Sequence, residues 1–288
     1  MIPRNFPPSF QLSLRNKHGG QKPPELCEML VRTFTKENEH VLDPLAGVGG
    51  TLLGCSLSGR KGTGIEMNQE WIDIYHQVCD LESVPTQEMR HGDAREVLDD
   101  LAKSKTRFDY ILTDVPYWKM DRVEKSRGTF KKVGEDAKGV FSDKSKLSPF
   151  NNTATAPLES LGKDAWKRSM KEIFERCFKV LEPGRYCCVF IGNMYHGGKY
   201  HLLNADIAGI LADVGFTLKG EIVWYDVSNN LHLYGINYSW IPSIVHQFIM
   251  VFRKERKKKL TKEERNGIEK ANINRIKTSG MRHEIIDS

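Results

Sequence analysis

The chain has 288 residues, with 43 Lys and Arg against 37 Asp and Glu, a formal net charge of +6 and 39% hydrophobic residues. This length and composition suit one elaborated α/β domain or two small ones, and the modest positive charge is compatible with a polyanionic partner. No apolar run approaches the roughly 20 residues of a membrane span, and residues 1–18 lack the apolar core of a secretory signal, so we expect a cytoplasmic protein without membrane association.

From about residue 22 to residue 118, helix-like and strand-like segments alternate. Apolar residues at helical spacing, with Pro at the start, predict a first helix over 24–35. Short apolar segments that end in Gly or a polar residue predict strands. The predicted strands are His40–Asp43, Gly62–Glu66 and Tyr110–Asp114, with a further strand ending near His91. The predicted helices between them are Thr51–Ser58, Gln69–Leu81 and Ala94–Lys103.

The second half repeats this pattern. An amphipathic helix is predicted over Lys163–Leu181, and it should stop at Glu182-Pro183-Gly184. A strand over Tyr186–Ile191, a helix over Leu203–Val214 and strands over 222–225 and 246–252 follow. Alternating β and α segments with short connections predict a single doubly wound, Rossmann-like sheet that is mostly parallel.

Two regions fall outside the pattern. Residues 119–161 are polar and rich in Gly, Ser and Lys, and a loop of that length is functional or disordered. From Arg253 onward the chain is strongly charged; the simplest interpretation of both regions is solvated surface. The expected organisation is an N-terminal arm (1–21), two halves of one domain (22–118 and 162–253), a basic insertion (119–161) between them and a charged tail (254–288).

The six cysteines have no CxxC spacing, and most lie inside apolar runs. We therefore expect reduced, buried thiols and no metal.

A nucleoside site is indicated by the segment that follows the first predicted strand. Asp43 precedes a glycine-rich turn with Gly47 and Gly49 and then a helix, whose first N–H groups are free to bind a ligand. Such turns also serve NAD, FAD and nucleotides. Glu66, at the next strand end, is placed to bind ribose hydroxyls, and Asp93, after the third, to accept from an adenine amino group. Asp43 would repel a pyrophosphate but attract an ammonium; the alternative is that these acids cap helices or face solvent.

The segment Thr113-Asp114-Val115-Pro116-Tyr117-Trp118 ends a buried strand in an acid, a rigid Pro turn and two aromatic residues. A carboxylate, a main-chain carbonyl and a ring face are thereby brought close together. This combination can hold a planar base by its exocyclic amino group. Core packing is the alternative for the two aromatic side chains.

Taken together, these segments resemble the DNA amino-methyltransferases, which make N6-methyladenine or N4-methylcytosine. His18–Leu26 resembles the family's Gln-Lys-Pro element, Asp43–Thr51 its glycine-rich S-adenosyl-L-methionine (AdoMet) loop, and Thr113–Trp118 its catalytic tetrapeptide. His246–Lys254 is similar to its last strand, which implies an antiparallel strand at the end of the sheet. The resemblance covers nearly the whole chain.

The resemblance implies AdoMet as cofactor and assigns residues to three groups. Asp114 and the carbonyl of Val115 would accept the protons of the target amino group, Pro116 would hold the turn, and Tyr117 would stack on the extruded base. The expected cofactor-binding residues are Lys22, Asp43, Pro44, Ala46, Gly47, Gly49, Glu66 and Asp93. Val115 departs from the family's Pro; its carbonyl remains available, but the restricted φ of Pro is lost.

DNA is the expected partner. Trp118 would extend the wall of the base pocket, and Arg127, Lys131 and Lys132 of the basic insertion would contact phosphates. Asn237 and Tyr238 belong to a polar and aromatic cluster that would read bases or line that pocket, or would form a hairpin packed on the sheet edge. Specificity would otherwise come from a partner subunit or a homodimer.

Several alternatives remain. Asp in the tetrapeptide favours adenine N6 over cytosine N4, and a role in restriction-modification is compatible with the family. An RNA methyltransferase acting on guanine N2 or adenine N6 is the second enzymatic interpretation, and a non-catalytic AdoMet- or DNA-binding homologue is the third.

Overall fold

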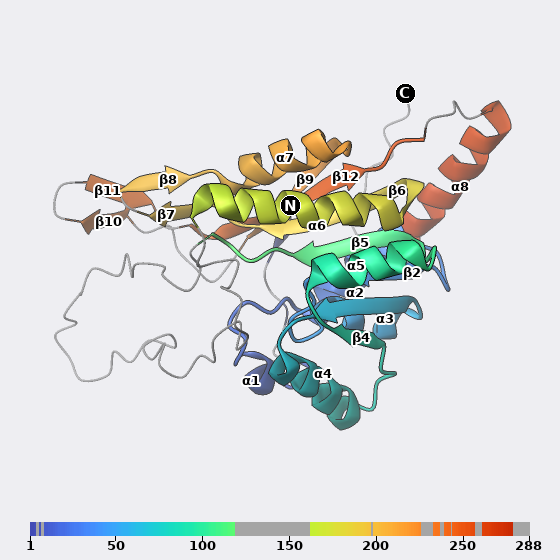
Figure 1. The fold of residues 1–288 in the computed structure, drawn as a ribbon, viewed down its shortest axis with the longest axis horizontal. Coiled ribbons are helices and arrows are strands. Elements are labelled where there is room, and N and C mark those ends of the chain that lie inside the picture. Colours follow the sequence, from blue (N-terminus) through green and yellow to red (C-terminus); the bar gives the residue numbers. More distant parts are fainter. Residues whose placement is uncertain are drawn as a thin grey trace.

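A central sheet organises the chain (Figure 1). The computed structural model describes residues 1–3, 6, 9–118, 162–196, 198–225, 233–236, 239–242, 244–256 and 261–278. Within these residues the sheet has eight strands in the order β1-β9-β12-β6-β5-β2-β3-β4. The strands are β1 (Ile2–Pro3), β2 (His40–Asp43), β3 (Lys61–Glu66), β4 (Glu88–His91), β5 (Phe108–Asp114), β6 (Leu181–Ile191), β9 (Thr217–Tyr225) and β12 (His246–Arg253).

Strands β4, β3, β2, β5 and β6 pair in parallel, whereas β12 runs antiparallel to both β6 and β9. The predicted doubly wound, mostly parallel sheet with an antiparallel last strand is therefore confirmed. Strand β5 lies in its middle and alternates its side chains between two cores. Phe108 and Ile111 join one core, and Tyr110 and Leu112 join the other, which explains why the three consecutive residues from Tyr110 to Leu112 are all apolar.

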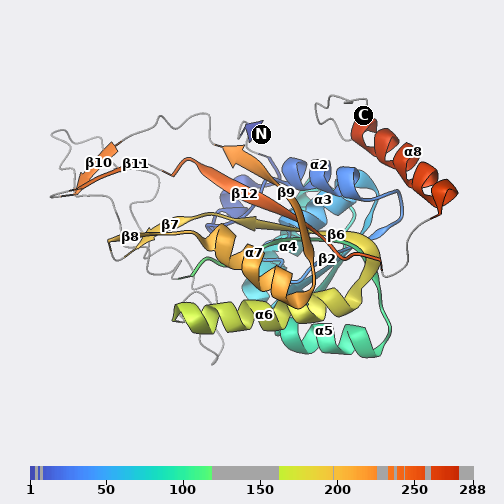
Figure 2. The ribbon, with the colours of Figure 1, turned by 90° about the horizontal axis from the view of Figure 1, so that it is seen from above.

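Helices cover both faces of the sheet. α5 (Ala94–Lys103), α6 (Lys163–Val180) and α7 (Leu203–Val214) lie on one face, and α2 (Pro24–Phe34) and α3 (Gly50–Ser58) lie on the other (Figure 2). α4 (Gln69–Glu82) packs beside α3. Its Trp71, Ile74, Tyr75 and Val78 have the spacing of one helix face and are all buried.

The junction of α6 and β6 differs from the prediction. The helix ends at Val180 and β6 begins at once with Leu181, although a break was expected at Glu182-Pro183-Gly184. In the β5–β6 register, Phe108 pairs with Leu181 and Tyr110 pairs with Tyr186, so the intervening residues of β6 form a bulge. Gly184 supplies the positive φ of 86° within this bulge.

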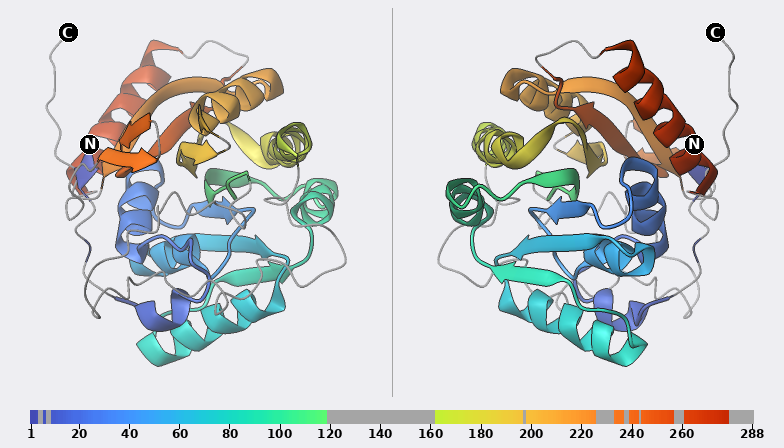
Figure 3. Two further views of the ribbon diagram at one scale, coloured as in Figure 1. Left: turned by 90° about the vertical axis from the view of Figure 1, so that its left-hand side faces the viewer. Right: turned by 90° about the vertical axis from the view of Figure 1, so that its right-hand side faces the viewer.

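Four features were not predicted as elements: β1, α1 (Leu12–Arg15), the hairpin of β7 (Met194–His196) and β8 (Lys199–His201), and α8 (Lys262–Thr278). The strands β10 (Leu233–Ile236) and β11 (Ser239–Pro242) form a hairpin, which was one of the two alternatives for the polar and aromatic cluster. The charged segment after Arg253 thus contains a long helix, which contacts α2 (Figure 3). Across the part of the chain that the structure describes, no helix is both long and apolar enough to cross a membrane. All six cysteines are buried free thiols, as the sequence predicted.

Candidate active site

Three acidic residues lie at the carboxyl ends of neighbouring parallel strands. β5 ends at Asp114, β2 at Asp43 and β3 at Glu66, and β2 is the strand between the other two. In doubly wound sheets, ligands bind outside this end of the strands. Burial raises the pKa of Asp43 and Glu66; the charge of Asp114 adds to the rise at Asp43, and that of Asp43 to the rise at Glu66. The three carboxylates therefore share one site.

Asp43 is almost completely buried, with 3% of its surface exposed. The N–H of Leu45 donates to Oδ1 at 3.2 Å, and the hydroxyls of Thr51 and Thr113 also favour the ionised form of the carboxylate. Burial outweighs these groups and raises the pKa of Asp43 to about 6. A buried carboxylate that is ionised at neutral pH favours a cationic group beside it.

The glycine-rich turn has the backbone conformation that only glycine adopts without strain. Gly47 has φ of 50° and Gly49 has φ of 75°, immediately before α3 begins at Gly50. A β-carbon on Gly49 would lie 2.2 Å from Cδ2 of Tyr75. The turn is thus pressed between α4 and the first turn of α3, where backbone N–H groups remain unpaired by the helix itself.

Pro44 and Ala46 complete this turn, and both are buried. The N–H of Ala46 donates to the carbonyl of Ile65 at 2.9 Å, which ties the turn to β3. The predicted cofactor-binding residues of the turn therefore form one rigid unit at the tip of β2.

Glu66 bridges the tip of β3 to the glycine-rich turn. Its Oε2 accepts from the N–H of Gly47 at 2.8 Å, and its Oε1 accepts from the N–H of Asn68 at 2.8 Å. Burial raises the pKa of Glu66 to about 7 despite these two donors. Each carboxylate oxygen accepts more than one hydrogen bond, so Glu66 retains capacity for further donors such as ribose hydroxyls.

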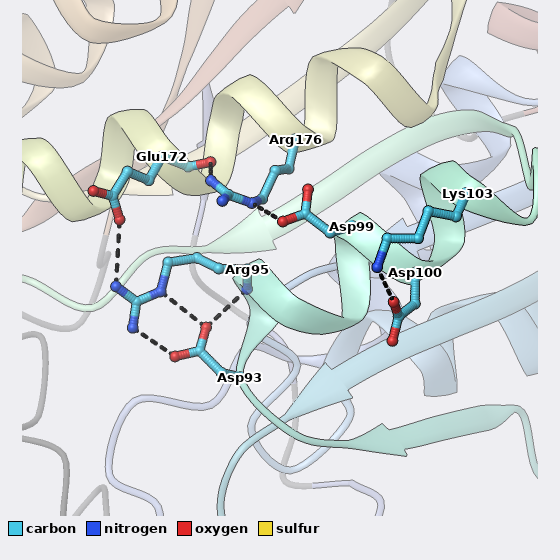
Figure 4. Close-up of polar contacts among 7 residues, drawn as sticks. All are labelled: Asp93, Arg95, Asp99, Asp100, Lys103, Glu172 and Arg176. Atoms are coloured by element: carbon cyan, nitrogen blue, oxygen red, sulfur yellow. Dashed lines mark hydrogen bonds and ion pairs between the residues drawn. The ribbon is translucent and has the colours of Figure 1, made fainter.

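Asp93 caps the N-terminus of α5 and is paired with Arg95 (Figure 4). Its Oδ1 accepts from the N–H and Nε of Arg95, and its Oδ2 accepts from the same guanidinium at 2.6 Å. These hydrogen bonds lower the pKa of Asp93. Arg95 also reaches Glu172 on α6, and Arg176 of α6 binds Asp99 at 2.9 Å, so this network joins α5 to α6. A role in adenine binding stays a prediction.

The segment before α2 contributes two residues to the site. The ammonium of Lys22 forms an ion pair with Oδ2 of Asp114, and the ring of His18 packs against Gly47, where a β-carbon would lie 2.9 Å from Nε2. Burial, together with the charges of Lys22 and Arg15, lowers the pKa of His18 to about 4. This imidazole is therefore neutral at physiological pH.

The predicted catalytic turn begins at Asp114. Its Oδ1 is buried and has no hydrogen-bond partner among the described residues, while its Oδ2 is held by Lys22. The N–H of Val115 donates to the carbonyl of Phe190 at 3.4 Å, which extends the β5–β6 pairing by one residue. Pro116 follows, and its carbonyl accepts from the indole N–H of Trp166 at 2.8 Å. The turn is thus anchored on β6 and on α6.

Tyr117 and Trp118 lie in different environments. Tyr117 is partly buried and its ring covers Gly192, where a β-carbon would lie 2.8 Å from the phenol oxygen. Trp118 is only 9% exposed and makes edge contacts with His196 and His201 of the β7–β8 hairpin, with ring centroids 5.3 and 4.8 Å away. Tyr117 therefore borders the strand tips, whereas Trp118 packs against the hairpin.

Five of the predicted substrate-binding residues lie outside the described residues: Arg127, Lys131, Lys132, Asn237 and Tyr238. The described backbone on both sides of the last two forms the β10–β11 hairpin.

Three residues of the site were not identified from the sequence: His18, Trp166 and Gly192. His18 is the first residue of the segment that includes Gln21, Lys22 and Pro23, and a position so close to that element is the only signal for it. Trp166 lies on the apolar face of a helix, where its indole N–H requires a partner when buried. Nothing in the sequence around Gly192 indicates that this glycine packs against Tyr117.

The residues at the strand tips fit AdoMet by the chemistry of their donors and acceptors. Asp43 offers a buried anion for an ammonium, Glu66 offers acceptors for ribose hydroxyls, and the first turn of α3 offers N–H groups. Among the described residues, no cluster of three or more His, Cys, Asp or Glu side chains could hold a metal ion.

Comparison with protein families places these motifs in a known group. The profile of the N6/N4 methyltransferases, a family described as DNA methylase, matches residues 4–77 and 108–284, which is most of the chain. Both the glycine-rich turn and the segment from Asp114 to Trp118 lie inside the matched ranges.

Individual relatives match over shorter stretches. The type II methyltransferase M.HpaI of Haemophilus parainfluenzae is 27% identical over 143 residues, which cover 46% of this chain and 45% of the relative. A candidate ribosomal RNA large subunit methyltransferase of Methanocaldococcus jannaschii is 24% identical over 90 residues, or 31% of this chain and 23% of the relative. The chain spans less than half of the length of the curated relatives it matches.

Among solved structures, TrmN from Thermus thermophilus superposes with a TM-score of 0.52 at 14% identity, covering 85% of this chain and 53% of that one. This similarity supports the fold alone.

Proposed function

The chain belongs to the N6/N4 DNA methylase family, whose cofactor is S-adenosyl-L-methionine, and from this premise we propose that it methylates an exocyclic amino group of a base in DNA. Adenine N6 is preferred over cytosine N4 because the catalytic turn begins with Asp114. The base would leave the duplex before reaction, since the amino group cannot otherwise reach the donor. A role in DNA modification beside a restriction nuclease, and a cytoplasmic location, are compatible with this activity.

One observation carries the proposal: the buried Oδ1 of Asp114 has no partner among the described residues, while Lys22 holds Oδ2. A buried acceptor without a donor is costly, and the cost is relieved when a ligand N–H arrives. The exocyclic amino group of adenine supplies such an N–H. This acceptor lies at the tip of β5, beside the strand that carries the glycine-rich turn.

The residues of the turn would act on the amino nitrogen together. Its lone pair is delocalised into the ring, so the nitrogen is a poor nucleophile until it becomes pyramidal. Acceptance of one N–H by Asp114 and of the other by the carbonyl of Val115 favours the pyramidal form and orients the lone pair. Val115 is 1% exposed and its N–H is held by Phe190, so packing replaces the rigidity that Pro gives other family members.

Cofactor binding is assigned to the tips of β2 and β3. Asp43 would hold the ammonium of AdoMet, Glu66 the ribose hydroxyls, and Pro44, Ala46, Gly47 and Gly49 the path of the turn. Asp93 would accept from the adenine amino group through the remaining lone pairs of its oxygens. When bound, AdoMet supplies an electrophilic methyl group. No metal has a role in this scheme.

The base and the DNA backbone would be held by other residues. Tyr117 would stack on the base, and Trp118, braced by His196 and His201, would support that wall. Arg127, Lys131 and Lys132 of the basic insertion over 119–161 would contact phosphates, and Asn237 and Tyr238 would contact bases. A homodimer or a specificity partner would supply further contacts.

An RNA base is the second candidate substrate, and the similarity to a candidate ribosomal RNA methyltransferase favours it. The two are separated by incubating the protein with tritiated AdoMet and either duplex DNA or total RNA. Digestion to nucleosides and mass spectrometry then identify the product. We expect N6-methyladenine in DNA. Methylated nucleosides in RNA alone would overturn the DNA proposal, and AdoMet binding without any product would indicate a non-catalytic homologue.

A further inference from the structure

Lys22 approaches the proposed catalytic carboxylate from a distant part of the chain. Its ammonium binds Oδ2 of Asp114 and also donates to the carbonyl of Gly20 at 3.3 Å. It lies over the ring of Phe190, 5.4 Å from the centroid, and its side chain is only 8% exposed. A buried ammonium needs such partners, and a carboxylate is the strongest of them.

The main chain of Lys22 is fixed at the start of α3, the helix that follows the glycine-rich turn. The guanidinium of Arg15, which is itself buried, donates to the carbonyl of Lys22. A β-carbon on Gly50, the first residue of α3, would lie 3.0 Å from that same carbonyl oxygen. Lys22 therefore touches the end of the glycine-rich turn with its main chain and the carboxylate of Asp114 with its side chain.

We propose that Lys22 is a positioning residue for methyl transfer, which holds Asp114 by Oδ2 and so presents Oδ1 to the target amino group. This inference rests on the proposed function of Asp114. It differs from the expectation that Lys22 binds the cofactor, because the ammonium is already engaged by Asp114. Lys22 thereby couples the glycine-rich turn to the carboxylate on the neighbouring strand.

Charge explains why Asp114 requires this partner. Burial raises the pKa of Asp114, and the ammonium of Lys22 lowers it. The charge of Asp114 in turn raises the pKa of two neighbouring groups, Asp43 at the tip of β2 and the thiol of Cys27 on α2, whose pKa is raised to about 12, chiefly by burial. An ionised Asp43 opposes ionisation of Asp114. Lys22 is thus the cation that keeps Asp114 ionised, and an ionised carboxylate stabilises the positive charge that develops on the amino nitrogen.

The test compares Lys22→Met, which keeps most of the aliphatic length, with Lys22→Arg, which keeps the charge, and with Lys17→Met, which replaces an exposed lysine of the segment before α2. Three quantities are measured on each folded variant. They are the single-turnover rate of DNA methylation between pH 5.5 and 9, the Kd of AdoMet by calorimetry, and the pKa of the Asp114 carboxyl by carbon-13 NMR, assigned with Asp114→Asn.

We expect Lys22→Met to raise the pKa of Asp114 by about one unit or more and to move the acid limb of the rate profile to higher pH. The single-turnover rate at pH 7 should fall by about tenfold or more, with the Kd of AdoMet changed by less than about threefold. Lys22→Arg should restore much of the rate, because a guanidinium also pairs with a carboxylate, and Lys17→Met should match the parent.

An unchanged pKa of Asp114 in Lys22→Met would overturn the inference whatever the activity. A normal rate at saturating AdoMet, together with a Kd raised by tenfold or more, would also overturn it and would assign Lys22 to the cofactor. A parent protein that methylates neither DNA nor RNA would refute the proposed function. The NMR result would then still decide whether Lys22 controls Asp114.

Discussion

The indole N–H of Trp166 donates to the carbonyl of Pro116 at 2.8 Å and ties α6 to the turn that follows β5. Trp166 has no exposed surface. This hydrogen bond holds the backbone of the proposed catalytic turn from the side of α6. The N–H of Val115 holds it from the other side, because it donates to the carbonyl of Phe190 on β6. Two independent contacts fix the turn, although it lacks the usual first Pro.

Replacement of Trp166 by Phe should therefore impair the turn. The variant leaves a buried carbonyl without its donor, which costs about 1–3 kcal/mol of unfolding free energy. Displacement of the turn should lower the single-turnover methylation rate by about 10- to 100-fold, with the Kd of AdoMet nearly unchanged. Urea unfolding measures the loss of stability, and rapid-quench assays measure the methylation rate.

Trp71→Phe is the matched control for stability, because the buried N–H of Trp71 has no hydrogen-bond partner among the described residues. Equal losses in both variants would show that only the packing of the indole counts.

AdoMet affinity should depend on the ionisation of Glu66. Its pKa is raised to about 7, and ribose hydroxyls bind the ionised form better. Ionisation of Glu66 should therefore raise the affinity about tenfold between pH 6 and pH 8, and ionisation of Asp43, whose pKa is about 6, about twofold more, so the parent should gain about 20-fold. Glu66→Gln should bind more weakly and keep only the twofold change that is due to Asp43. Calorimetry at several pH values measures this. A parent protein with pH-independent affinity would contradict the assignment.

Asp43 should make the protein less stable as the pH rises. Its folded pKa of about 6 lies above the ordinary value of 3.8, so between these values the folded state binds more protons than the unfolded state. The stability due to Asp43 is thus present at low pH and is lost as the pH rises through about 6. Asp43→Asn does not ionise, and its stability relative to the parent should increase by about 1–2 kcal/mol between pH 5 and pH 7. Urea unfolding in the absence of AdoMet tests this, and a constant difference would be evidence against a buried, ionising Asp43.

Two glycines with similar backbone angles provide a matched pair. Gly49 has φ of 75° and Gly59 has φ of 68°, but only at Gly49 would a β-carbon meet another group, the ring of Tyr75. Gly59→Ala should cost about 1–2 kcal/mol for the left-handed conformation alone. Gly49→Ala should cost about 1–3 kcal/mol more and weaken AdoMet binding. Thermal unfolding and calorimetry distinguish the two. Equal stability of the variants would mean that the turn is not pressed against α4.

Most of the sheet and its helices could be predicted because local signals mark their ends. β2, α5 and α7 have the predicted limits, since Asp43 precedes a glycine-rich turn, Asp93 caps α5 and Gly215 ends α7. The charged residues of α8 show no apolar period, so the sequence predicts a solvated tail there, although Lys and Glu favour helix. The β7–β8 hairpin was missed because its strands have only three residues each.

The candidate site was predictable in part. The acids at the strand ends follow from alternation of strands and helices, because parallel strands bring their carboxyl ends together. The pairing of Lys22 with Asp114 spans 92 residues, and no local pattern indicates which of several acids a lysine will meet. Trp166 and Gly192 also contact the turn from distant parts of the chain, and no local pattern indicates these contacts either. Such contacts depend on how the core packs and cannot be read from spacing.

The central claim is that Asp114 accepts the target amino group. Its most direct test is the methylation rate of Asp114→Ala and Asp114→Asn on duplex DNA with saturating tritiated AdoMet. Asp100→Ala, which removes an exposed aspartate of α5, is the control. We expect both Asp114 variants to bind AdoMet but to lose at least about 100-fold in rate, while the Asp100→Ala variant keeps the parent rate. Methylation by Asp114→Ala near the parent rate would contradict the assignment of Asp114 and with it the proposed mechanism.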